Sequence, residues 1–537
     1  MKQPNIVLTG FMGTGKSTVG RLIAEKSGRS FIDTDETIIR QTGQTISEIF
    51  SKSGEQRFRE LEQQIAYELE NVENSVIATG GRLLLEPLNA LLLSSNGLIF
   101  CLTAPPKEIL RRVEGTGKRP LLEVENPEEK VVGLLKSRQT AYQQFQQIET
   151  SERTADDVAS EIIAKAGRLI RDGLWSQRLV SKLSVRHPTG KYPILVGQEI
   201  LPNLRQHLST AGSLVIVTDD RLSKLNADLM NALNPLQIIE IPAGEQHKNL
   251  ETIIPIYSQL LDSGLDRSGT VAAIGGGVVG DMAGFLAATY MRGVSLIQCP
   301  TTLLAMVDAS IGGKTGVDLA QGKNLVGAFK QPAAVVADLS TLKTLPEEEW
   351  LSGMAEIIKH GLIANPRLLE RVESVFWKKD QGSSNNQLQT MVVEAIIVKQ
   401  DIVQRDPFER GIRTHLNLGH TFAHAIETLS QYRIKHGFAV AMGLVASAHL
   451  SSKLGHCDPE LVSYIENLLL DVGLPTRIPP NLDPEELLQV MKLDKKRAAG
   501  MVRYVLIHSA GEVFTASDVP QQAVTATISK LQEPKTN

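Results

Sequence analysis

Short apolar runs alternate with helical patterns along this chain up to about residue 345. The first run, at residues 5–9, leads through a glycine-rich turn into a helical pattern that begins near residue 18. Further runs typical of buried strands follow at residues 179–185, 213–218 and 269–274. Strands that alternate with helical segments predict an α/β sheet. From about residue 345 the pattern is helical almost throughout, until an apolar run at 502–507.

This patterning predicts an α/β protein with three parts. A charged helical stretch over residues 151–180 separates a first α/β domain from a second repeat of strands and helices. We place the first domain at residues 1–170, a second α/β part at 178–344 and a mostly helical part at 345–530. A chain of 537 residues allows each part to bury its own core.

Composition narrows the class of protein. Hydrophobic residues make up 42% and charged residues 22%, and the formal net charge is -4, which provides no basic surface for nucleic acid or membrane. No apolar run reaches the roughly 18 residues of a membrane span, and residues 6–8 are too short a run for a signal peptide. Cys101, Cys299 and Cys457 form no CxxC pair. We expect a cytoplasmic protein.

The turn from Gly10 to Ser17 fits GxxxxGK[ST] completely and has a strand before it and a helix after it. Its backbone N–H groups can surround phosphates, while Lys16 neutralises charge and Ser17 binds magnesium. The motif predicts a nucleoside triphosphate site without identifying the acceptor. The expected ATP-binding residues are Gly13, Thr14, Gly15, Lys16, Ser17 and Thr18.

Acidic and basic residues elsewhere in the first domain could hold the acceptor. Asp33 and Asp35 end the next predicted strand, where one could support magnesium and the other a substrate hydroxyl. Further candidates are Arg59, the pair Gly80-Gly81 followed by Arg82, a basic lid at Lys118-Arg119, and Arg138.

Together these motifs resemble shikimate kinase over roughly residues 3–168. The resemblance implies that Ser17 and Asp33 bind Mg²⁺ with ATP and that Arg119 closes over ATP. It also implies a catalytic role for Arg119 and Asp35, and shikimate binding by Asp35, Arg59, Gly80, Gly81 and Arg138. The family usually has a third glycine where this chain has Arg82, which would affect shikimate binding if Arg82 crowds the ring. A related kinase, such as a gluconate kinase, is the alternative.

A second group of residues predicts a metal site. His420 and His424 lie four residues apart on one face of a predicted helix, and His436 follows that helix. Glu356, on another predicted helix, could complete a site of the kind that holds zinc with one position open. Groups suited to an anionic, hydroxylated substrate surround these positions in the sequence, namely Lys359, Lys399, Arg413 and Asn417.

Glycine-rich turns precede this group. Residues 274–281 follow a strand and open a helix, a weak dinucleotide signal that is strengthened by polar residues at other strand ends, including Asp219. A further glycine turn over residues 306–318 carries Asp308 and Lys314, and Lys323-Asn324 follows it. Such a turn suggests that the backbone closely approaches a charged ligand.

The array over about residues 180–520 closely resembles 3-dehydroquinate synthase. The resemblance implies a site for zinc, or for cobalt in its place, at Glu356, His420 and His436. The implied NAD residues are Asp219, Glu245, Lys248, Gly277, Asp281, Thr301, Thr302 and Lys323. The implied substrate residues are Asp308, Lys314, Asn324, Lys359, Lys399, Arg413, Asn417, His424, Arg292 and Lys495, with Lys314, Lys359 and His424 also catalytic. Arg292 would reach the neighbouring subunit's site, which implies a homodimer.

The implied substrate is 3-deoxy-D-arabino-heptulosonate 7-phosphate. NAD would oxidise the C5 hydroxyl, and phosphate would then be eliminated. NADH would return the hydride, so that NAD is unchanged overall, and an aldol closure would form the ring of 3-dehydroquinate. The family usually continues with an acid two residues after the third metal ligand, where this chain has Phe438, and the missing acid would loosen the orientation of His436. We expect activity to survive, because every direct metal ligand is present. Alternatives are a deoxyinosose or valiolone synthase and, for the first domain, a nucleotide sensor.

Overall fold

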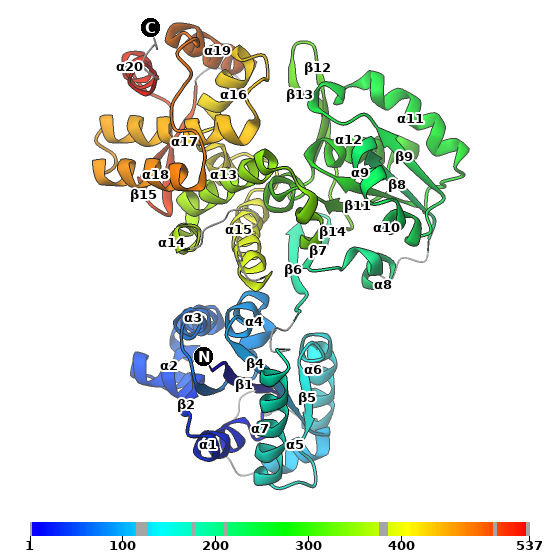
Figure 1. Cartoon of the computed structure of the whole chain (residues 1–537), viewed down its shortest axis with the longest axis vertical. Helices are drawn as coiled ribbons and strands as arrows, with labels where there is room; N and C mark the ends of the chain where they lie inside the picture. Colours follow the sequence, from blue (N-terminus) through cyan, green and yellow to red (C-terminus); the bar gives the residue numbers. More distant parts are fainter. Residues whose placement is uncertain are drawn as a thin grey trace. The chain divides into compact units, whose positions relative to one another are not determined.

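The computed structural model describes residues 3–113, 126–173, 178–208, 212–374, 385–497 and 502–532. The chain divides into two compact units, Met1–Ser181 and Lys182–Asn537. Across the described ranges, no helix combines the length and the apolar character needed to cross a membrane. Figure 1 traces the chain from β1 at its N-terminus to α20 near its C-terminus.

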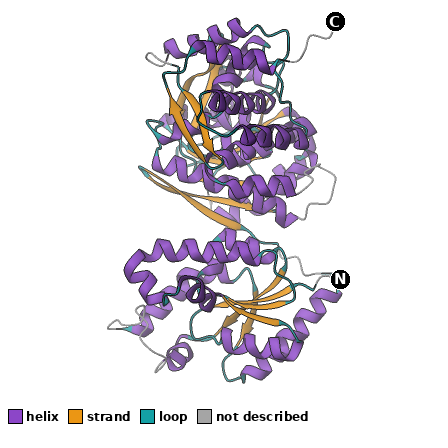
Figure 2. Ribbon diagram, turned by 90° about the vertical axis from the view of Figure 1, so that its left-hand side faces the viewer, coloured by secondary structure: helices purple, strands orange, loops and turns teal. Residues whose placement is uncertain are grey.

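The first unit is built on a five-stranded parallel sheet in the order β2-β3-β1-β4-β5. Every residue of the central strand β1 is buried, as expected for a strand covered by helices on both faces. Helices lie on both sides of this sheet (Figure 2). The strands are β1 (Asn5–Gly10), β2 (Ser30–Asp33), β3 (Ser75–Ala78), β4 (Gly97–Thr103) and β5 (Gln146–Glu149). The helices are α1 (Lys16–Ser27), α2 (Thr34–Thr42), α3 (Ile46–Leu69), η1 (Leu83–Leu85), α4 (Pro87–Ser94), α5 (Pro106–Val113), α6 (Pro127–Tyr142) and α7 (Ala155–Arg171).

The second unit begins with a seven-stranded sheet in the order β6-β7-β14-β11-β10-β8-β9. Its pairs from β7 to β9 are parallel, so the loops after these strands lie at one edge of the sheet. The strands are β6 (Ser181–His187), β7 (Gly190–Gly197), β8 (Leu214–Asp219), β9 (Gln237–Ile241), β10 (Thr270–Gly275), β11 (Ser295–Pro300) and β14 (Ala334–Asp338). Its helical segments are η2 (Leu201–Asn203), α8 (Leu204–Leu208), α9 (Asp220–Leu225), α10 (Ala227–Ala232), η3 (Glu245–His247), α11 (Leu250–Asp262), α12 (Gly277–Thr289), η4 (Tyr290–Arg292), η5 (Ala305–Ala309) and η6 (Leu339–Thr344).

The rest of this unit is mainly helical. The helices are α13 (Glu347–Ala364), α14 (Pro366–Ser374), α15 (Asn385–Arg405), η7 (Ile412–Asn417), α16 (His420–Leu429), α17 (His436–Lys453), α18 (Pro459–Val472), α19 (Pro484–Arg497) and α20 (Gln521–Leu531). Most residues of α13 and α17 are buried. Helix α17 is largely apolar, whereas the buried part of α13 also carries Glu356, Lys359 and His360. Two antiparallel hairpins accompany them, β12 (Lys314–Leu319) with β13 (Gly322–Phe329) and β15 (Tyr504–Ser509) with β16 (Glu512–Ala516).

Glycines bring α13, α16 and α17 into backbone contact. A Cβ atom on Gly437 would lie 2.2 Å from the Cα atom of Ser352 in α13, and one on Gly443 would lie 2.1 Å from the carbonyl oxygen of Gly419. Both distances are far below van der Waals contact, so only glycine fits there. Since Gly437 follows His436 and Gly419 precedes His420, these contacts determine where both histidines lie.

Most elements agree with the patterning. The α/β class is confirmed, as are the strands expected at 5–9, 213–218 and 269–274 and the helix that begins at His420. The glycine turn expected over 306–318 is wrong in its extent. The segment is a π-helical turn followed by β12, which pairs with β13 in a hairpin. The glycines in the segment do not indicate this pairing, because it depends on the partner strand. The run at 502–507 is a strand, and its partner β16 was not expected.

We predict that Gly443→Ala destabilises the second unit. The added methyl group would collide with the backbone of Gly419, and such overpacking costs about 1–3 kcal/mol. Urea unfolding followed by tryptophan fluorescence would measure the loss. Gly167→Ala is the control, because this helical glycine in α7 has open space at its Cβ position. Equal stability of Gly443→Ala and the parent protein would contradict the close contact.

Candidate functional site

The phosphate-binding turn of the first unit joins β1 to α1. Gly10, Gly13 and Gly15 have positive φ values of 132°, 77° and 91°. A Cβ atom on Gly10 would lie 2.3 Å from the carbonyl oxygen of Leu102, so this position requires glycine. The turn ends at the N-terminus of α1, where unpaired N–H groups favour an anion. Lys16 begins the helix, and its Nζ atom lies 3.0 Å from the carbonyl oxygens of Gly10 and Phe11.

The two predicted magnesium residues meet beside this turn. The hydroxyl of Ser17 donates to Oδ2 of Asp33 over 2.6 Å. The other oxygen of Asp33 caps α2 by accepting from the backbone N–H groups of Asp35 and Glu36 at 3.0 and 3.3 Å. Asp33 therefore holds a fixed orientation in which one carboxylate oxygen faces the phosphate-binding turn.

The predicted acceptor residues also come together. A Cβ atom on Gly80 would lie 2.6 Å from Oδ1 of Asp35 and 3.1 Å from a carboxylate oxygen of Glu62. Arg59 forms an ion pair with Glu62, which is almost completely buried. Burial raises the pKa of Glu62 to about 7, against the opposing attraction of Arg59. Sequence analysis missed Glu62, although its position three residues after Arg59 on a helix was a usable signal.

Three predicted arginines of the first unit remain, Arg82, Arg119 and Arg138. Arg138 is buried, with its guanidinium group 5.1 Å from the centre of the Phe11 ring. Tyr142, one turn further along α6, donates to the carbonyl oxygen of Gly81 over 2.6 Å. Arg82 points to Glu55, with 2.8 Å between Nη1 and Oε1. Arg119, together with Lys118, lies outside the described residues.

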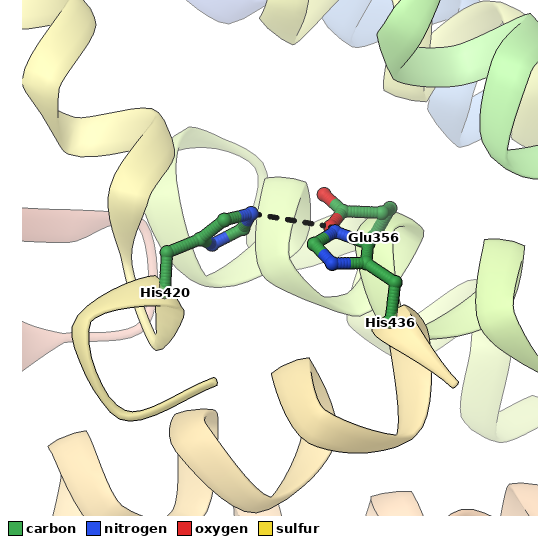
Figure 3. A group of neighbouring side chains, drawn as sticks. All are labelled: Glu356, His420 and His436. Atoms are coloured by element: carbon green, nitrogen blue, oxygen red, sulfur yellow. Dashed lines mark ion pairs between the residues drawn. The ribbon is translucent and has the colours of Figure 1, made fainter. Parts of the chain in front are cut away.

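In the second unit, Glu356, His420 and His436 converge from α13, α16 and α17 (Figure 3). Oε1 of Glu356 lies 3.6 Å from Nε2 of His420 and 3.5 Å from Nε2 of His436. Glu356 is completely buried, and no described residue donates a hydrogen bond to this oxygen. Three ligand atoms of the kinds that bind zinc thus face one another.

The other ring nitrogens of the histidines contact fixed oxygen atoms. Nδ1 of His420 lies 3.1 Å from the carbonyl oxygen of Leu418, and Nδ1 of His436 lies 3.3 Å from Oε2 of Glu427. Each Nδ1–H can donate there, which leaves Nε2 of both rings directed at Glu356. Burial lowers the pKa of His420 to about 3. Burial acts in the same direction on His436, but the attraction of the Glu356 and Glu427 carboxylates prevails and raises its pKa to about 9.

Buried cations balance the acids around this cluster. Lys359 pairs with Glu356, and Lys399 pairs with Asp308. Burial opposes the charge of Lys359, but the attraction of Asp308 and Glu356 raises its pKa. His360 is also completely buried, with its Nε2 atom 3.8 Å from Asp308. The predicted substrate residues of α13 and α15 therefore lie beside the metal-ligand cluster.

Helix η7 and the loop before it add further groups. Arg413 is buried, and its guanidinium group donates to the carbonyl oxygens of Pro407 and Gly312 over 2.7 and 3.2 Å. Glu409 joins two predicted residues, since it pairs with Lys314 and accepts from Asn417 over 3.3 Å. Glu409 has a positive φ of 58°, and sequence analysis missed it because no local motif marks it.

The predicted NAD residues gather at the edge of the seven-stranded sheet. Asp219 ends β8, the strand that pairs with β10, and its side chain caps α9. Gly277 begins α12 directly after β10, and the N–H group of Thr301 donates to the carbonyl oxygen of Gly275 over 3.0 Å. A Cβ atom on Gly276 would lie 3.1 Å from Thr302. Ligands of open α/β sheets bind at such an edge.

Ion pairs connect this edge to the histidine cluster. Nζ of Lys248 lies 2.7 Å from Asp281, 2.6 Å from Oδ1 of Asn324 and 4.0 Å from Glu245. Lys323, on β13, lies 3.6 Å from Glu245 and 3.1 Å from Glu427. Glu427 also contacts His436, so one carboxylate joins a residue of the NAD group to a metal-ligand candidate. Sequence analysis assigned no role to Glu427.

Three further predicted residues remain to be placed. His424 is exposed on α16, with its ring centre 5.5 Å from that of His420. Arg292, the last residue of η4, is exposed with a φ of 65°, and within the described part of the chain no hydrogen bond or ion pair joins it to the cluster. Lys495 belongs to α19, but its side chain lies outside the described residues.

Comparison with known proteins assigns a family to each unit. The family model "Shikimate kinase" matches residues 12–166. The models "3-dehydroquinate synthase N-terminal" and "3-dehydroquinate synthase C-terminal" match residues 238–352 and 353–497. The chain is 43% identical over 344 residues to 3-dehydroquinate synthase of Symbiobacterium thermophilum, covering 62% of this chain and 96% of that protein. It is 42% identical over 334 residues to the Synechococcus enzyme of the same name, covering 61% and 91%.

Solved structures show the same architecture. A 2-deoxy-scyllo-inosose synthase complexed with carbaglucose-6-phosphate, NAD⁺ and Co²⁺ is 25% identical with a TM-score of 0.57, covering 65% of this chain and 99% of that one. The 2-epi-5-epi-valiolone synthase of Streptomyces hygroscopicus with NAD⁺ and Zn²⁺ bound is 25% identical with a TM-score of 0.59, covering 63% and 96%. The chain belongs to the 3-dehydroquinate synthase family and carries a shikimate kinase domain ahead of the synthase, which makes it a bifunctional enzyme of the shikimate pathway.

Proposed function

We propose that the first unit transfers phosphate from ATP to shikimate and that the second converts 3-deoxy-D-arabino-heptulosonate 7-phosphate to 3-dehydroquinate and phosphate. The observation that carries the synthase assignment is the convergence of Glu356, His420 and His436 beside buried lysines. For the kinase it is the contact between Ser17 and Asp33 beside the phosphate-binding turn. The higher identity to dehydroquinate synthases favours this substrate over those of the inosose and valiolone synthases.

In the kinase, the phosphate-binding turn and Lys16 would hold the triphosphate, and Ser17 with Asp33 would hold Mg²⁺. Asp35 would orient the attacking hydroxyl of shikimate or accept its proton, because it lies against Gly80 at the presumed ring position. Arg59 and Arg138 would bind the carboxylate of shikimate. Arg59 reaches this position through Glu62, which lies against Gly80 as Asp35 does.

The histidine cluster fits a divalent metal. Ligands in a tetrahedral zinc site lie roughly 3.4 Å apart, close to the 3.5 and 3.6 Å measured from Glu356 to the two Nε2 atoms. The buried carboxylate oxygen faces the Nε2 atoms of both histidines, and a cation bound between them would replace the proton that His436 otherwise carries. We propose that Glu356, His420 and His436 hold Zn²⁺ or Co²⁺.

When bound, NAD would supply a hydride acceptor for the C5 hydroxyl of the substrate, and the metal would polarise the C5 oxygen. The protein's own groups would then act by position. Lys399 and Arg413 would bind the anionic ends of the substrate, and Asp308 would keep Lys399 oriented. His424, exposed beside His420, would transfer a proton near the phosphate end.

Glu427 contacts His436 in place of the acid that the family usually has at the position of Phe438. The expected acid two residues after His436 is absent, yet the Nδ1 atom of His436 contacts Glu427 from the neighbouring helix. We propose that Glu427 orients this metal ligand and maintains its basicity. It is itself held by Lys323, so its position depends on the hairpin β12–β13.

Assembly and compartment are further proposals. Exposed Arg292 would complete the synthase site of a second copy in a homodimer, and Lys495 would contact the substrate phosphate. Three unpaired cysteines, two of them buried, suit a reducing cytoplasm.

Lys16→Met should abolish phosphorylation of shikimate, with a loss of about 100-fold or more, because a charge that stabilises the transferred phosphoryl group is removed. The synthase rate of the same chain should not change, which makes it an internal control. A coupled ADP assay and a phosphate-release assay measure the two activities. If the parent chain leaves shikimate unchanged while ATP alters the synthase rate, the first unit is a nucleotide sensor instead.

His420→Ala should lose both metal and synthase turnover, whereas His424→Ala should retain metal and lose turnover by about 100-fold or more. Elemental analysis after dialysis and phosphate release from the heptulosonate phosphate separate the two effects. The exposed residue His456, which stacks on Phe514, provides a matched control as His456→Ala. Loss of metal from His424→Ala would contradict the assignment of these roles.

Glu427→Gln should weaken metal binding about tenfold, because the amide is a poorer acceptor for the Nδ1–H group of His436. Competition of the metal-free protein with a chromophoric chelator measures the affinity without an activity assay. The control is Glu349→Gln, which removes a partner of Lys435 next to His436 but leaves the imidazole contacts intact. Unchanged affinity in Glu427→Gln would show that another group orients the ligand.

A further inference from the structure

Arg82 follows Gly80-Gly81, at the position from which its side chain could crowd the shikimate ring. Its guanidinium group instead pairs with Glu55, with Nη1 2.8 Å from Oε1, and 42% of the Arg82 side chain is exposed. The glycine pair keeps its own close contacts, because Gly80 lies against Asp35 and the carbonyl oxygen of Gly81 accepts from Tyr142. Arg82 therefore does not fill the space beside the glycines.

The partner of Arg82 is shared with the predicted carboxylate-binding arginine. Oε1 of Glu55 also accepts from Nη2 and Nε of Arg59, over 2.9 and 3.3 Å. Arg59 and Arg82 thus contact the same oxygen atom. Arg59 is the less exposed of the two, and its other partner is the buried carboxyl group of Glu62.

This sharing has an electrostatic consequence for an acidic substrate. The hydrogen bond from Arg59 outweighs burial and, together with the attraction of Arg82, lowers the pKa of Glu55, which is therefore ionised at neutral pH. An ionised Glu55 competes with a substrate carboxylate for Arg59 and repels it. A second arginine on the same oxygen offsets that charge and occupies part of its hydrogen-bonding capacity.

We propose that Arg82 is a positioning residue for the acceptor's carboxylate. By offsetting part of the charge of Glu55, it weakens the competition of Glu55 with a ring carboxylate for Arg59. The inference rests on the proposed kinase function and concerns its acceptor site alone. It assigns to Arg82 a favourable effect on acceptor affinity, the opposite of what steric crowding would produce.

A double-mutant cycle tests the coupling. Arg82→Gly should raise the KM for shikimate about fivefold, the scale of an exposed ion pair, with little change in kcat or in the KM for ATP. In a Glu55→Gln background, the same change should raise that KM less than about twofold, because no charge remains to offset. Arg82→Lys, which keeps the charge, should restore most of the affinity.

The full chain provides the controls. Arg57→Ala removes another exposed arginine of α3, one that pairs with Glu60, and should leave the KM for shikimate unchanged. An unchanged kcat and an unchanged KM for ATP report that the kinase unit of each variant is folded. A lower or unchanged KM in Arg82→Gly, or an equal factor in both backgrounds, would overturn the proposal. Failure of the parent chain to phosphorylate shikimate would instead refute the kinase function itself.

Discussion

Close contact between helix backbones is the constraint on which the synthase site depends. Helices α13, α16 and α17 approach each other at Gly437 and Gly443, where even a methyl group would overlap the neighbouring backbone. The metal-ligand candidates stand beside these contacts, so the packing of apolar helices also determines the distances between polar atoms. The phosphate-binding turn follows the same rule, since Gly10 lies against the backbone of β4.

Burial of charge is the second determinant of both sites. Glu356 pairs with Lys359 and Asp308 pairs with Lys399 in a largely buried region, and each charge is tolerated because an opposite one lies beside it. In the kinase, Glu62 has a raised pKa because it is buried between Arg59 and the glycine pair. The position of each acid depends on its basic partner in the folded chain, so a motif read along the sequence does not reveal it.

The two departures from the family patterns have related explanations. At Arg82 and at Phe438 the chain lacks a residue that the resemblance leads one to expect, and in each case an acid from another segment makes the relevant contact. Glu55 and Glu427 are each shared between two basic groups. Substitution in one segment is therefore accommodated by charge supplied from another, which inspection of the motif alone does not reveal.

The sequence by itself determined the α/β class, the strands at 5–9, 213–218 and 269–274, and the phosphate-binding turn, because each depends on local periodicity or on glycines at fixed spacing. Only the tertiary structure decided that Glu409 and Glu427 accompany the predicted residues, and that β12–β13 is a hairpin. The physical reason is that an ion pair across helices requires a distance, and sequence spacing defines distances only within a single element.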